Sequence, residues 1–428
     1  MRWQNWAGNQ VMTPLGVAHP RGTDEIAQAV KGASAQGRRV KAIGSGHSFT
    51  SIGLTDGVLI QLDQHAELLG IDGDLVTVQA GMPLHELNAL LTAHGRGLVN
   101  MGDIDAQTVS GAISTGTHGT GRASASIAAQ VAALGLVLAD GSVVVCSPTE
   151  RPDLFEHARI GLGALGVIST VTFRTEPLFH LHADEGPMPL SDVLDGYDEL
   201  VDGNDHFEFF WFPHTEVALT KRNNRTTDPV DPIPPRRAWF DDVFLSNHVF
   251  GAVCAVGAVA PRLIPAVNKL SAKALSARSY TDVAPKVFIS QRSVRFHEME
   301  YAVPRAELPA LFHELRAVID RLGERISFPV EVRAAPGDDI PLSTASGRDT
   351  AYVALHQYRR TPYERYFTAV ERLFGEVAGR PHWGKLHHLG ADELRARYPR
   401  FDDFQAVRRN VDPEGLFRNA YLDQVLGA

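Results

Sequence analysis

A short apolar run at residues 39–43 breaks abruptly into the glycine-rich loop Gly44-Ser-Gly-His-Ser48. The apolar run predicts a β-strand. Glycines directly after a strand let backbone N–H groups close around a phosphate, because glycine lacks a Cβ and tolerates positive φ. His47 follows where the chain would pass closest to a bound group. This stretch therefore predicts an α/β unit with a phosphate-binding loop.

A second loop rich in small residues spans residues 102–121 and contains Thr115-Gly-Thr-His-Gly119. It is too polar and too rich in glycine for a core strand. A spacer of about 70 residues, with strand-like and helix-like patterns, separates it from the first loop. Two such loops in one domain favour a site that wraps a long dinucleotide. The alternative is a pair of ordinary surface turns.

The hydrophobic spacing around these loops predicts alternating elements. Helices are expected at residues 23–31, 83–94 and 153–160, and strands at 58–62, 75–79, 131–138, 143–146 and 167–173. The segment Gly161-Leu-Gly-Ala-Leu-Gly166 matches GxGxxG. A dinucleotide fingerprint of that kind needs a strand before it and a helix after it. The order here is reversed, so we interpret the segment as a turn that lets the backbone approach an adenine or a ribose.

Composition excludes several classes of function. The chain has 428 residues and a formal charge of −9, which argues against a nucleic-acid partner. Its two cysteines, Cys146 and Cys254, have no metal-type spacing, which favours a cytoplasmic protein with neither a disulfide framework nor a metal site. The N-terminal residues lack a signal-peptide core. The longest apolar run, residues 249–260, is shorter than the ~20 residues of a membrane span. We expect no integral membrane segment and leave shallow membrane contact open.

The pattern of expected secondary structure changes after residue 175. Strand-like runs occur at residues 206–212, 296–303, 327–333 and 352–358, with helices expected after Pro304 and Pro362. A proline-rich loop is expected at 228–235, and an alanine-rich helical stretch from about 249 to 276. These features predict a second, α+β domain that begins near residue 176.

For three groups of residues, the sequence allows more than one chemical role. His47 can be a packing residue, a general base or a covalent anchor. Glu331 and Arg333 alternate on one strand face, as do His356 and Tyr358, and such a face is either functional or a solvated salt bridge. Lys385 is either a cation beside a cofactor or one solvated base among many.

Taken together, the motifs resemble a known group of flavoproteins. Gly44-Ser-Gly-His-Ser-Phe49, Thr115-Gly-Thr-His-Gly119 and Pro381-His-Trp-Gly-Lys385 resemble the vanillyl-alcohol-oxidase superfamily. Glu331-Val-Arg333 and Glu298-Met-Glu-Tyr-Ala-Val-Pro304 make the chain similar to its aldonolactone oxidoreductase branch, which includes L-gulono-1,4-lactone oxidases and dehydrogenases and D-arabinono-1,4-lactone oxidases, and which is close to the alditol oxidases. The resemblance covers nearly the whole chain.

This resemblance implies an α+β fold with a two-subdomain FAD-binding domain of the PCMH type at residues 1–175. A substrate or cap domain with an antiparallel sheet would span residues 176–410, and residues 411–428 would return to the FAD domain. FAD would be bonded covalently to the ring of His47. The other residues implied to contact FAD are Ile43, Gly44, Ser45, Gly46, Ser48, Thr108, Gly111, Thr115, Gly116, Thr117, His118, Val167 and Ile168.

The resemblance also implies a reaction at a CH–OH group. An aldono-1,4-lactone would be oxidised at a carbinol carbon to a 2-keto, ascorbate-type product, with O2 or a cytochrome- or dye-type acceptor taking the electrons. The catalytic residues would be Glu331, Arg333, His356 and Lys385, with His356 or Glu331 accepting the proton. Asp103 and Tyr358 would contact the substrate, and Gly102 would gate oxygen. The alternatives are an alditol oxidase that converts xylitol or sorbitol at C1 with H2O2 formation, and a flavin-binding protein without turnover.

Overall fold

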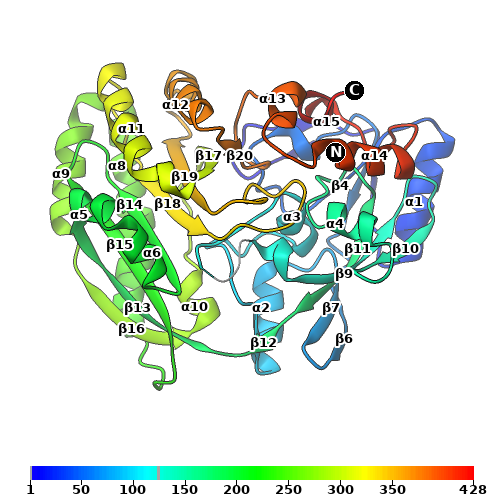
Figure 1. The fold of residues 1–428 in the computed structure, drawn as a ribbon, viewed down its shortest axis with the longest axis horizontal. Helices are drawn as coiled ribbons and strands as arrows, with labels where there is room; N and C mark the ends of the chain where they lie inside the picture. The colour runs from blue at the N-terminus through cyan, green and yellow to red at the C-terminus, as the bar shows by residue number, and fades with distance from the viewer. Residues whose placement is uncertain (1, 123–125) are drawn as a thin grey trace.

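The computed structural model describes residues 2–122 and 126–428 and has two lobes (Figure 1). The lobe with both termini contains two small sheets. One is a parallel sheet in the order β3-β5-β4, and the other is antiparallel in the order β10-β9-β11-β7-β6. Their strands are β3 (Gly16–Ala18), β4 (Val40–Ile43), β5 (Val58–Gln61), β6 (Leu68–Asp72), β7 (Leu75–Gln79), β9 (Val131–Val137), β10 (Val143–Cys146) and β11 (Val167–Arg174).

Helices accompany these sheets: α1 (Thr23–Ala35), α2 (Leu84–Ala93), α3 (Val109–Ser114) and α4 (Pro152–Ala158). In α1 the acids Asp24 and Glu25 lie in the first turn, where they complement the helix dipole, while Ile26 and Val30 are buried. The expected strands and helices are present within one to four residues of their predicted ends. β6 was missed because its residues are mostly exposed and carry no apolar alternation.

The second lobe is built on an antiparallel eight-stranded sheet in the order β16-β13-β15-β14-β18-β19-β17-β20. The strands are β13 (His180–Pro189), β14 (His206–Trp211), β15 (Val217–Thr226), β16 (Arg278–Val283), β17 (Phe296–Pro304), β18 (Val330–Ala335), β19 (Thr350–Tyr358) and β20 (Arg380–Pro381). Short pairs complete the sheets: β1 (Trp3–Gln4) with β2 (Val11–Met12), and β8 (Arg96–Gly97) with β12 (Glu176–Pro177).

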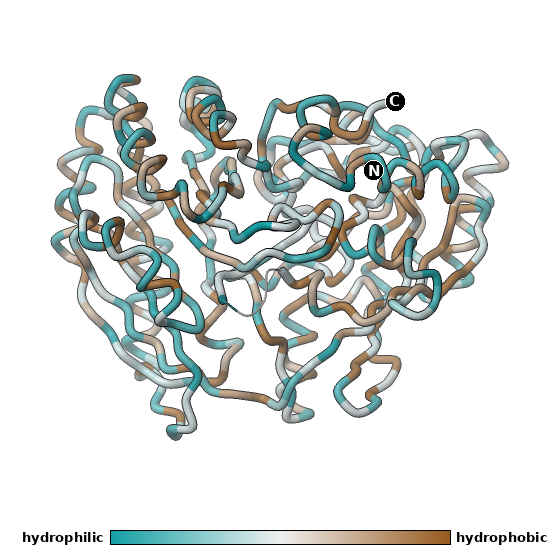
Figure 2. Tube along the Cα trace, viewed as in Figure 1, coloured by the Kyte–Doolittle hydropathy of each residue, from teal (hydrophilic) through white to brown (hydrophobic). Residues whose placement is uncertain are grey.

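The large sheet has one apolar face. Register places Phe209 opposite Val332 and Val332 opposite Val353, and all three are buried in the main core. The amphipathic helices α11 (Leu308–Leu322) and α12 (Glu364–Glu376), which alternate hydrophilic and hydrophobic residues in Figure 2, contribute to the same core. Three shorter helices also belong to this lobe: α5 (Leu190–Asp195), α6 (Tyr197–Asp202) and α10 (Ala284–Phe288).

The opposite face of the sheet carries a row of alternating charges. Arg278, Glu185, Lys221, Glu208 and Arg333 stand directly opposite one another on five adjacent strands. Opposite charges in cross-strand positions stabilise a register, and a shift by one residue would place these charges in the apolar core. The row therefore defines which face of the sheet is polar.

A long helical segment lies at the edge of this lobe. It comprises α7 (Pro235–Ala238), a π-helix (Trp239–Val249) and α8 (Phe250–Val259), and a short turn at Pro261 separates it from α9 (Ile264–Ala274). The predicted helical stretch at about 249–276 is present and ends as expected, near Ala274, but its start was placed too late. The segment begins about 14 residues earlier and is interrupted at Pro261, which has no N–H to donate. Among the described residues, one helix, Pro235–Val259, is long and apolar enough to cross a membrane, by length and composition alone.

The C-terminal residues pack against the first lobe through α13 (Ala391–Arg395), α14 (Phe401–Val411) and α15 (Ala420–Leu426). The N–H of Val40 donates to the carbonyl of Leu416 at 2.9 Å. The side chain of Asn419 donates to the carbonyls of Ile52 and Leu54, at 2.9 Å each. Strand β4 and the loop after it are therefore held by residues more than 360 positions away.

Candidate active site

The first glycine-rich loop forms one wall of a cavity of about 120 Å³. Thr108 and α3 form another wall, and the turn at residues 161–166 contributes Gly163 and Gly166. Ten of the expected FAD residues line it: Ile43, Gly44, Ser45, Gly46, His47, Ser48, Thr108, Gly111, Thr115 and Ile168. Gly116, Thr117, His118 and Val167 are not part of the lining.

The glycines at this wall cannot be replaced without displacing neighbours. A Cβ on Gly44 would lie 2.2 Å from Oγ1 of Thr108. Gly46 has a φ of +74°, and a Cβ there would lie 2.8 Å from the ring of Trp3. The loop therefore presents backbone without side chains to the cavity at Gly44 and Gly46. These residues fit a bound dinucleotide.

His47 presents a neutral imidazole to this region. Its ring stacks on Trp6 with centroids 5.6 Å apart and an interplanar angle of 22°. Burial, followed by the charge of Lys385, lowers the pKa of His47 to about 4. Within the described residues, no hydrogen bond engages either ring nitrogen of His47. An uncharged ring with free nitrogens has the state that a nucleophile requires.

Lys41 is a buried cation that the sequence analysis did not single out. It lies on β4, lines the cavity, and donates from Nζ to the carbonyls of Gly163 at 3.2 Å and Phe417 at 3.3 Å. Burial, followed by the charge of Arg408, lowers its pKa to about 7. The nearby Asp412 already accepts the N–H groups of Leu416 and Phe417 through its two oxygens. In the described structure this ammonium has no carboxylate bonded to it.

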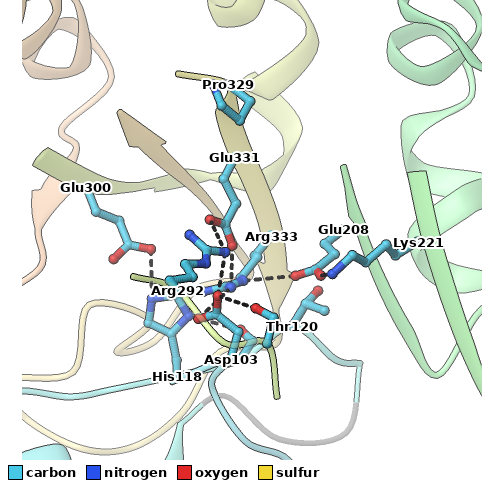
Figure 3. Close-up of polar contacts among 12 residues, drawn as sticks. Asp103, His118, Thr120, Glu208, Lys221, Arg292, Glu300, Pro329, Glu331 and Arg333 are labelled. Carbon is cyan, nitrogen blue, oxygen red and sulfur yellow. Dashed lines mark hydrogen bonds and ion pairs between the residues drawn. The ribbon is translucent and has the colours of Figure 1, made fainter. Parts of the chain in front are cut away.

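The second loop directs His118 toward the large sheet. Nε2 of His118 lies 3.1 Å from Oε1 of Glu300 (Figure 3). Nδ1 lies 2.9 Å from the carbonyl of Gly119, and the ring stacks on Tyr352 with centroids 3.5 Å apart. Both ring nitrogens of His118 face acceptor oxygens, and His118 and Glu300 form a buried pair. Burial would raise the pKa of Glu300, but His118, together with His382 and Lys385, holds that pKa at about 2.

His382 completes a group of three possible metal ligands with His118 and Glu300. The N–H of Gly384 donates to Nδ1 of His382 at 3.0 Å. Burial lowers the pKa of His382 to about 3, so the ring is neutral and its other nitrogen carries the proton. In this state neither nitrogen of His382 offers a free lone pair to a metal, while His118 and Glu300 are paired with each other.

Arg333 is the centre of a buried charge cluster on the polar face of the sheet (Figure 3). Its Nη2 pairs with Glu331 and lies 3.1 Å from Oδ1 of Asp103, while its Nε donates to Glu208 at 3.0 Å. The pKa of Glu331 is raised, mainly by burial, although Arg333 and Arg292 oppose that change. Glu331 is thus a carboxylate with increased proton affinity beside a fixed guanidinium.

Asp103 forms ion pairs with two arginines, which its sequence context did not indicate. It pairs with Arg292 as well as with Arg333. Burial would raise its pKa, but these two arginines hold the pKa well below its usual range. The space beside the neighbouring Gly102 is narrow, because a Cβ there would lie 3.1 Å from the carbonyl oxygen of His118. Arg292 comes from the loop before β17, and no sequence pattern marks it.

A second group on the same face contains the other two expected catalytic residues. His356 has Nε2 3.5 Å from Oε1 of Glu298 and Nδ1 3.3 Å from the carbonyl of Pro329. Lys385 pairs with the other oxygen of Glu298. Glu298 stands opposite His356 in the sheet, and its alternation with Glu300 was the signal that could have revealed it.

The two lobes meet at this second group. The N–H of Phe49 donates to the carbonyl of Gly384 at 2.7 Å, and Thr50 donates to the carbonyl of Trp383 at 3.2 Å. Tyr358 lies in a small apolar cluster with Phe49 and other aromatic residues. These contacts bring Lys385 into electrostatic contact with His47. The end of the sheet face at Lys385 therefore adjoins the loop with His47.

Two known protein families match the sequence of this chain. The model of the D-arabinono-1,4-lactone oxidase family matches residues 171–425, and that of an FAD-binding domain matches residues 14–147. The chain is 43% identical over 427 residues to an L-gulono-1,4-lactone dehydrogenase of Mycobacterium tuberculosis, with 99% of each chain covered. The chain belongs to the D-arabinono-1,4-lactone oxidase family. Both the expected superfamily and the expected aldonolactone branch are confirmed.

A further sequence relative and a solved structure are also similar to this chain. An L-gulonolactone oxidase of Bos taurus is 34% identical, with 99% of this chain and 98% of the relative covered. A cholesterol oxidase from Brevibacterium sterolicum superposes with a TM-score of 0.83 at 17% identity, covering 99% of this chain and 96% of that one. At that identity the likeness concerns the fold, and it supports the expected FAD-binding and antiparallel-sheet architecture.

Proposed function

We propose that this protein oxidises an aldono-1,4-lactone of the L-gulono-1,4-lactone type, with FAD bonded covalently to His47. One observation carries the proposal: Glu331 and Arg333 share one sheet face with His356 and Glu298, and Lys385 joins that face to the loop of His47. The names of the similar proteins, which include gulonolactone dehydrogenases and oxidases and D-arabinono-1,4-lactone oxidases, support this substrate class.

When bound, FAD supplies the two-electron acceptor that takes a hydride from the carbinol carbon. Glu331 accepts the hydroxyl proton, since its raised pKa makes it a stronger base than an ordinary carboxylate. His356 is less suited to this step, because both of its nitrogens already face acceptors. Arg333 holds the lactone oxygens, and Lys385 places positive charge beside the flavin. The product is the 2-keto lactone.

We also propose roles for individual residues around the cofactor and the substrate. The cavity-lining residues would hold the FAD diphosphate and ring, and Val167 and Ile168 would meet the adenine end. Asp103 would shape the substrate pocket through Arg292 and Arg333, and Tyr358 would close its side. The electron acceptor is O2 or a cytochrome- or dye-type acceptor. Because the space beside Gly102 is narrow, oxygen would need local movement of the second loop to pass there.

Acid denaturation of the purified protein tests the flavin bond. We expect yellow colour to remain with the polypeptide of the native sequence and to be released from a His47→Ala variant. Loss of the colour from both proteins would refute the bond.

Anaerobic bleaching tests the substrate class. L-Gulono-1,4-lactone should bleach the flavin, whereas xylitol and sorbitol should not. A Glu331→Gln variant should keep its flavin spectrum and bleach about 10²- to 10⁴-fold more slowly, as expected for loss of a general base. Bleaching by polyols alone would favour an alditol oxidase, and absence of bleaching by any of these compounds would favour a flavin-binding protein without turnover.

A further inference from the structure

The N-terminal hairpin, residues 3–12, is hydrogen-bonded along the loop that carries His47. The N–H of Trp6 donates to the carbonyl of Gly46 at 2.8 Å. Three side-chain amides of the hairpin donate to the carbonyls of the two residues that follow His47, at 2.9 to 3.0 Å; they belong to Asn5, Asn9 and Gln10. Carbonyls on both sides of His47 are therefore held by the hairpin, which fixes the backbone at this position.

The indole of Trp6 also orients the ring of His47. The two rings stack with centroids 5.6 Å apart and an interplanar angle of 22°. Trp6 is itself held by Phe296 in an edge-to-face contact, with centroids 5.3 Å apart. Aromatic pairs in these arrangements attract each other beyond the area that they bury. Because no hydrogen bond holds the imidazole within the described residues, its orientation depends on this stack.

The same stack keeps water from one face of the imidazole. Burial is the main reason that the pKa of His47 is lowered, ahead of the charge of Lys385. Lys385 is the charged group that acts on His47, and its own charge is paired with Glu298. A neutral imidazole keeps the lone pair that a nucleophile needs, whereas an imidazolium has none. Trp6 therefore favours both the orientation and the charge state in which His47 can attack a carbon atom.

We propose that Trp6 is a positioning residue that holds His47 in place, out of water, for the covalent attachment of FAD. The proposal rests on the function proposed above, in which His47 bonds the flavin. In that reaction one hydrogen leaves a methyl group of the flavin ring, one leaves the imidazole, and a carbon–nitrogen bond forms. The two electrons and two protons stay on the flavin until O2 takes them up as H2O2, so the step needs no other co-reactant.

The rate of flavin attachment to the full chain tests this role. Chain produced under riboflavin limitation is mixed with FAD in air, and the flavin that stays with acid-precipitated protein is measured by fluorescence over time. Trp6→Leu keeps an apolar side chain and the backbone N–H but removes the stacked face, so it should attach flavin about 10- to 100-fold more slowly than the native sequence. Trp6→Phe restores an aromatic face and should recover most of the rate.

Reversible binding separates positioning from loss of the cofactor site. In a His47→Ala background, where no bond can form, Trp6→Leu should bind FAD as tightly as its parent. Trp211→Leu is the matched control for stability, because Trp211 lies on the large sheet and is buried in the main core. It should lower the unfolding temperature at least as much as Trp6→Leu does and leave the attachment rate unchanged.

The pH dependence of attachment is a readout that a purely structural role would not change. Trp6→Ala uncovers the imidazole, so the pKa of His47 should rise from about 4 toward its ordinary value of about 6.5. At pH 5.5 roughly a tenth of the rings would then be neutral, whereas the rings of the native sequence stay neutral. The ratio of the variant rate to the native rate should therefore fall about tenfold between pH 8 and pH 5.5.

Two outcomes would overturn the role of Trp6 and leave the His47 bond intact. One is attachment by Trp6→Leu at the native rate, and the other is a rate ratio for Trp6→Ala that does not change with pH. Absence of attached flavin in the native sequence would instead refute the bond itself, and with it the role of Trp6.

Discussion

Lys41 shows how a single buried charge can indicate its ligand. Its ammonium is enclosed by the carbonyls of Gly163 and Phe417 and lines the cavity of the first loop. A buried cation is costly unless an anion accompanies it. The diphosphate is the anionic part of FAD, so we expect it to supply the missing charge.

We predict that FAD affinity falls as the pH rises from 7 to 9. Below pH 7 Lys41 is already charged in the flavin-free protein, given its pKa of about 7, whereas above pH 7 it must take up a proton to hold the diphosphate. Affinity should then fall by up to about tenfold per pH unit. The measurement is a fluorescence titration of flavin-free His47→Ala protein, so that binding is reversible.

The matched variant for this titration is Lys41→Met in the same background. At pH 6.5 it should bind FAD about 10- to 100-fold more weakly, the worth of a hydrogen bond to a charged group. Its affinity should not depend on pH between 7 and 9. Adenosine, which has no phosphate, should bind both proteins equally. Parallel pH profiles for the two proteins would show that Lys41 does not contact the diphosphate.

At the scale of elements, the row of alternating charges across the large sheet positions Arg333. Glu208 accepts from Arg333 at 3.0 Å and lies 3.2 Å from Lys221. A guanidinium held at its Nε keeps its terminal nitrogens in a fixed direction, toward Glu331 and Asp103. Glu208 is thus expected to act on the reaction through Arg333 without touching the lactone.

We predict that Glu208→Gln raises KM for the lactone about tenfold or more while the flavin spectrum is preserved. The same variant should destabilise the protein by about 3–5 kcal/mol, since Lys221 and Arg333 lose a buried partner. Glu185→Gln, at the next acidic position of the row, should also lower the unfolding temperature but leave KM unchanged. If both variants raise KM equally, Glu208 is only structural.

Sequence periodicity predicted the elements better than their contacts. The alternation at Glu331 and Arg333 correctly indicated a shared strand face, because a strand has a period of two. The pairing of Glu298 with His356 depends on cross-strand register, which periodicity does not specify. Strands β13, β15 and β16 were missed because each carries a charged residue of the row, Glu185, Lys221 or Arg278, whose partner lies on a neighbouring strand. The helix before residue 249 was missed because prolines at 232–235 suggested a loop.

At the scale of the whole molecule, the site depends on residues from both ends of the chain. Asn419 caps α15 by accepting from Leu422 and donates to carbonyls of the loop at residues 51–54. Asn419→Ala should therefore destabilise the flavin-free protein by about 2–4 kcal/mol, the sum of a cap and two hydrogen bonds. It should also reduce flavin incorporation, which thermal unfolding and the ratio of flavin to protein absorbance measure.

The control for this variant lies on the same helix. Among the described residues, the side chain of Gln424 makes one hydrogen bond, to the carbonyl of Leu389 at 3.2 Å. Gln424→Ala should cost about 1 kcal/mol and leave flavin incorporation intact. Equal flavin content in the two variants would mean that the C-terminal residues do not organise the first loop.

The bond between Lys41 and Phe417 also bears on how the protein is made. These residues are 376 positions apart, and Val40 is bonded to Leu416 beside them. A ribosome releases the chain from its N-terminus, at about 5–20 residues per second. At that rate, roughly 20 seconds or more pass between the synthesis of Lys41 and the synthesis of its partner Phe417. We therefore expect cofactor loading to follow translation, and a chain interrupted before residue 416 to leave the ribosome without bound flavin.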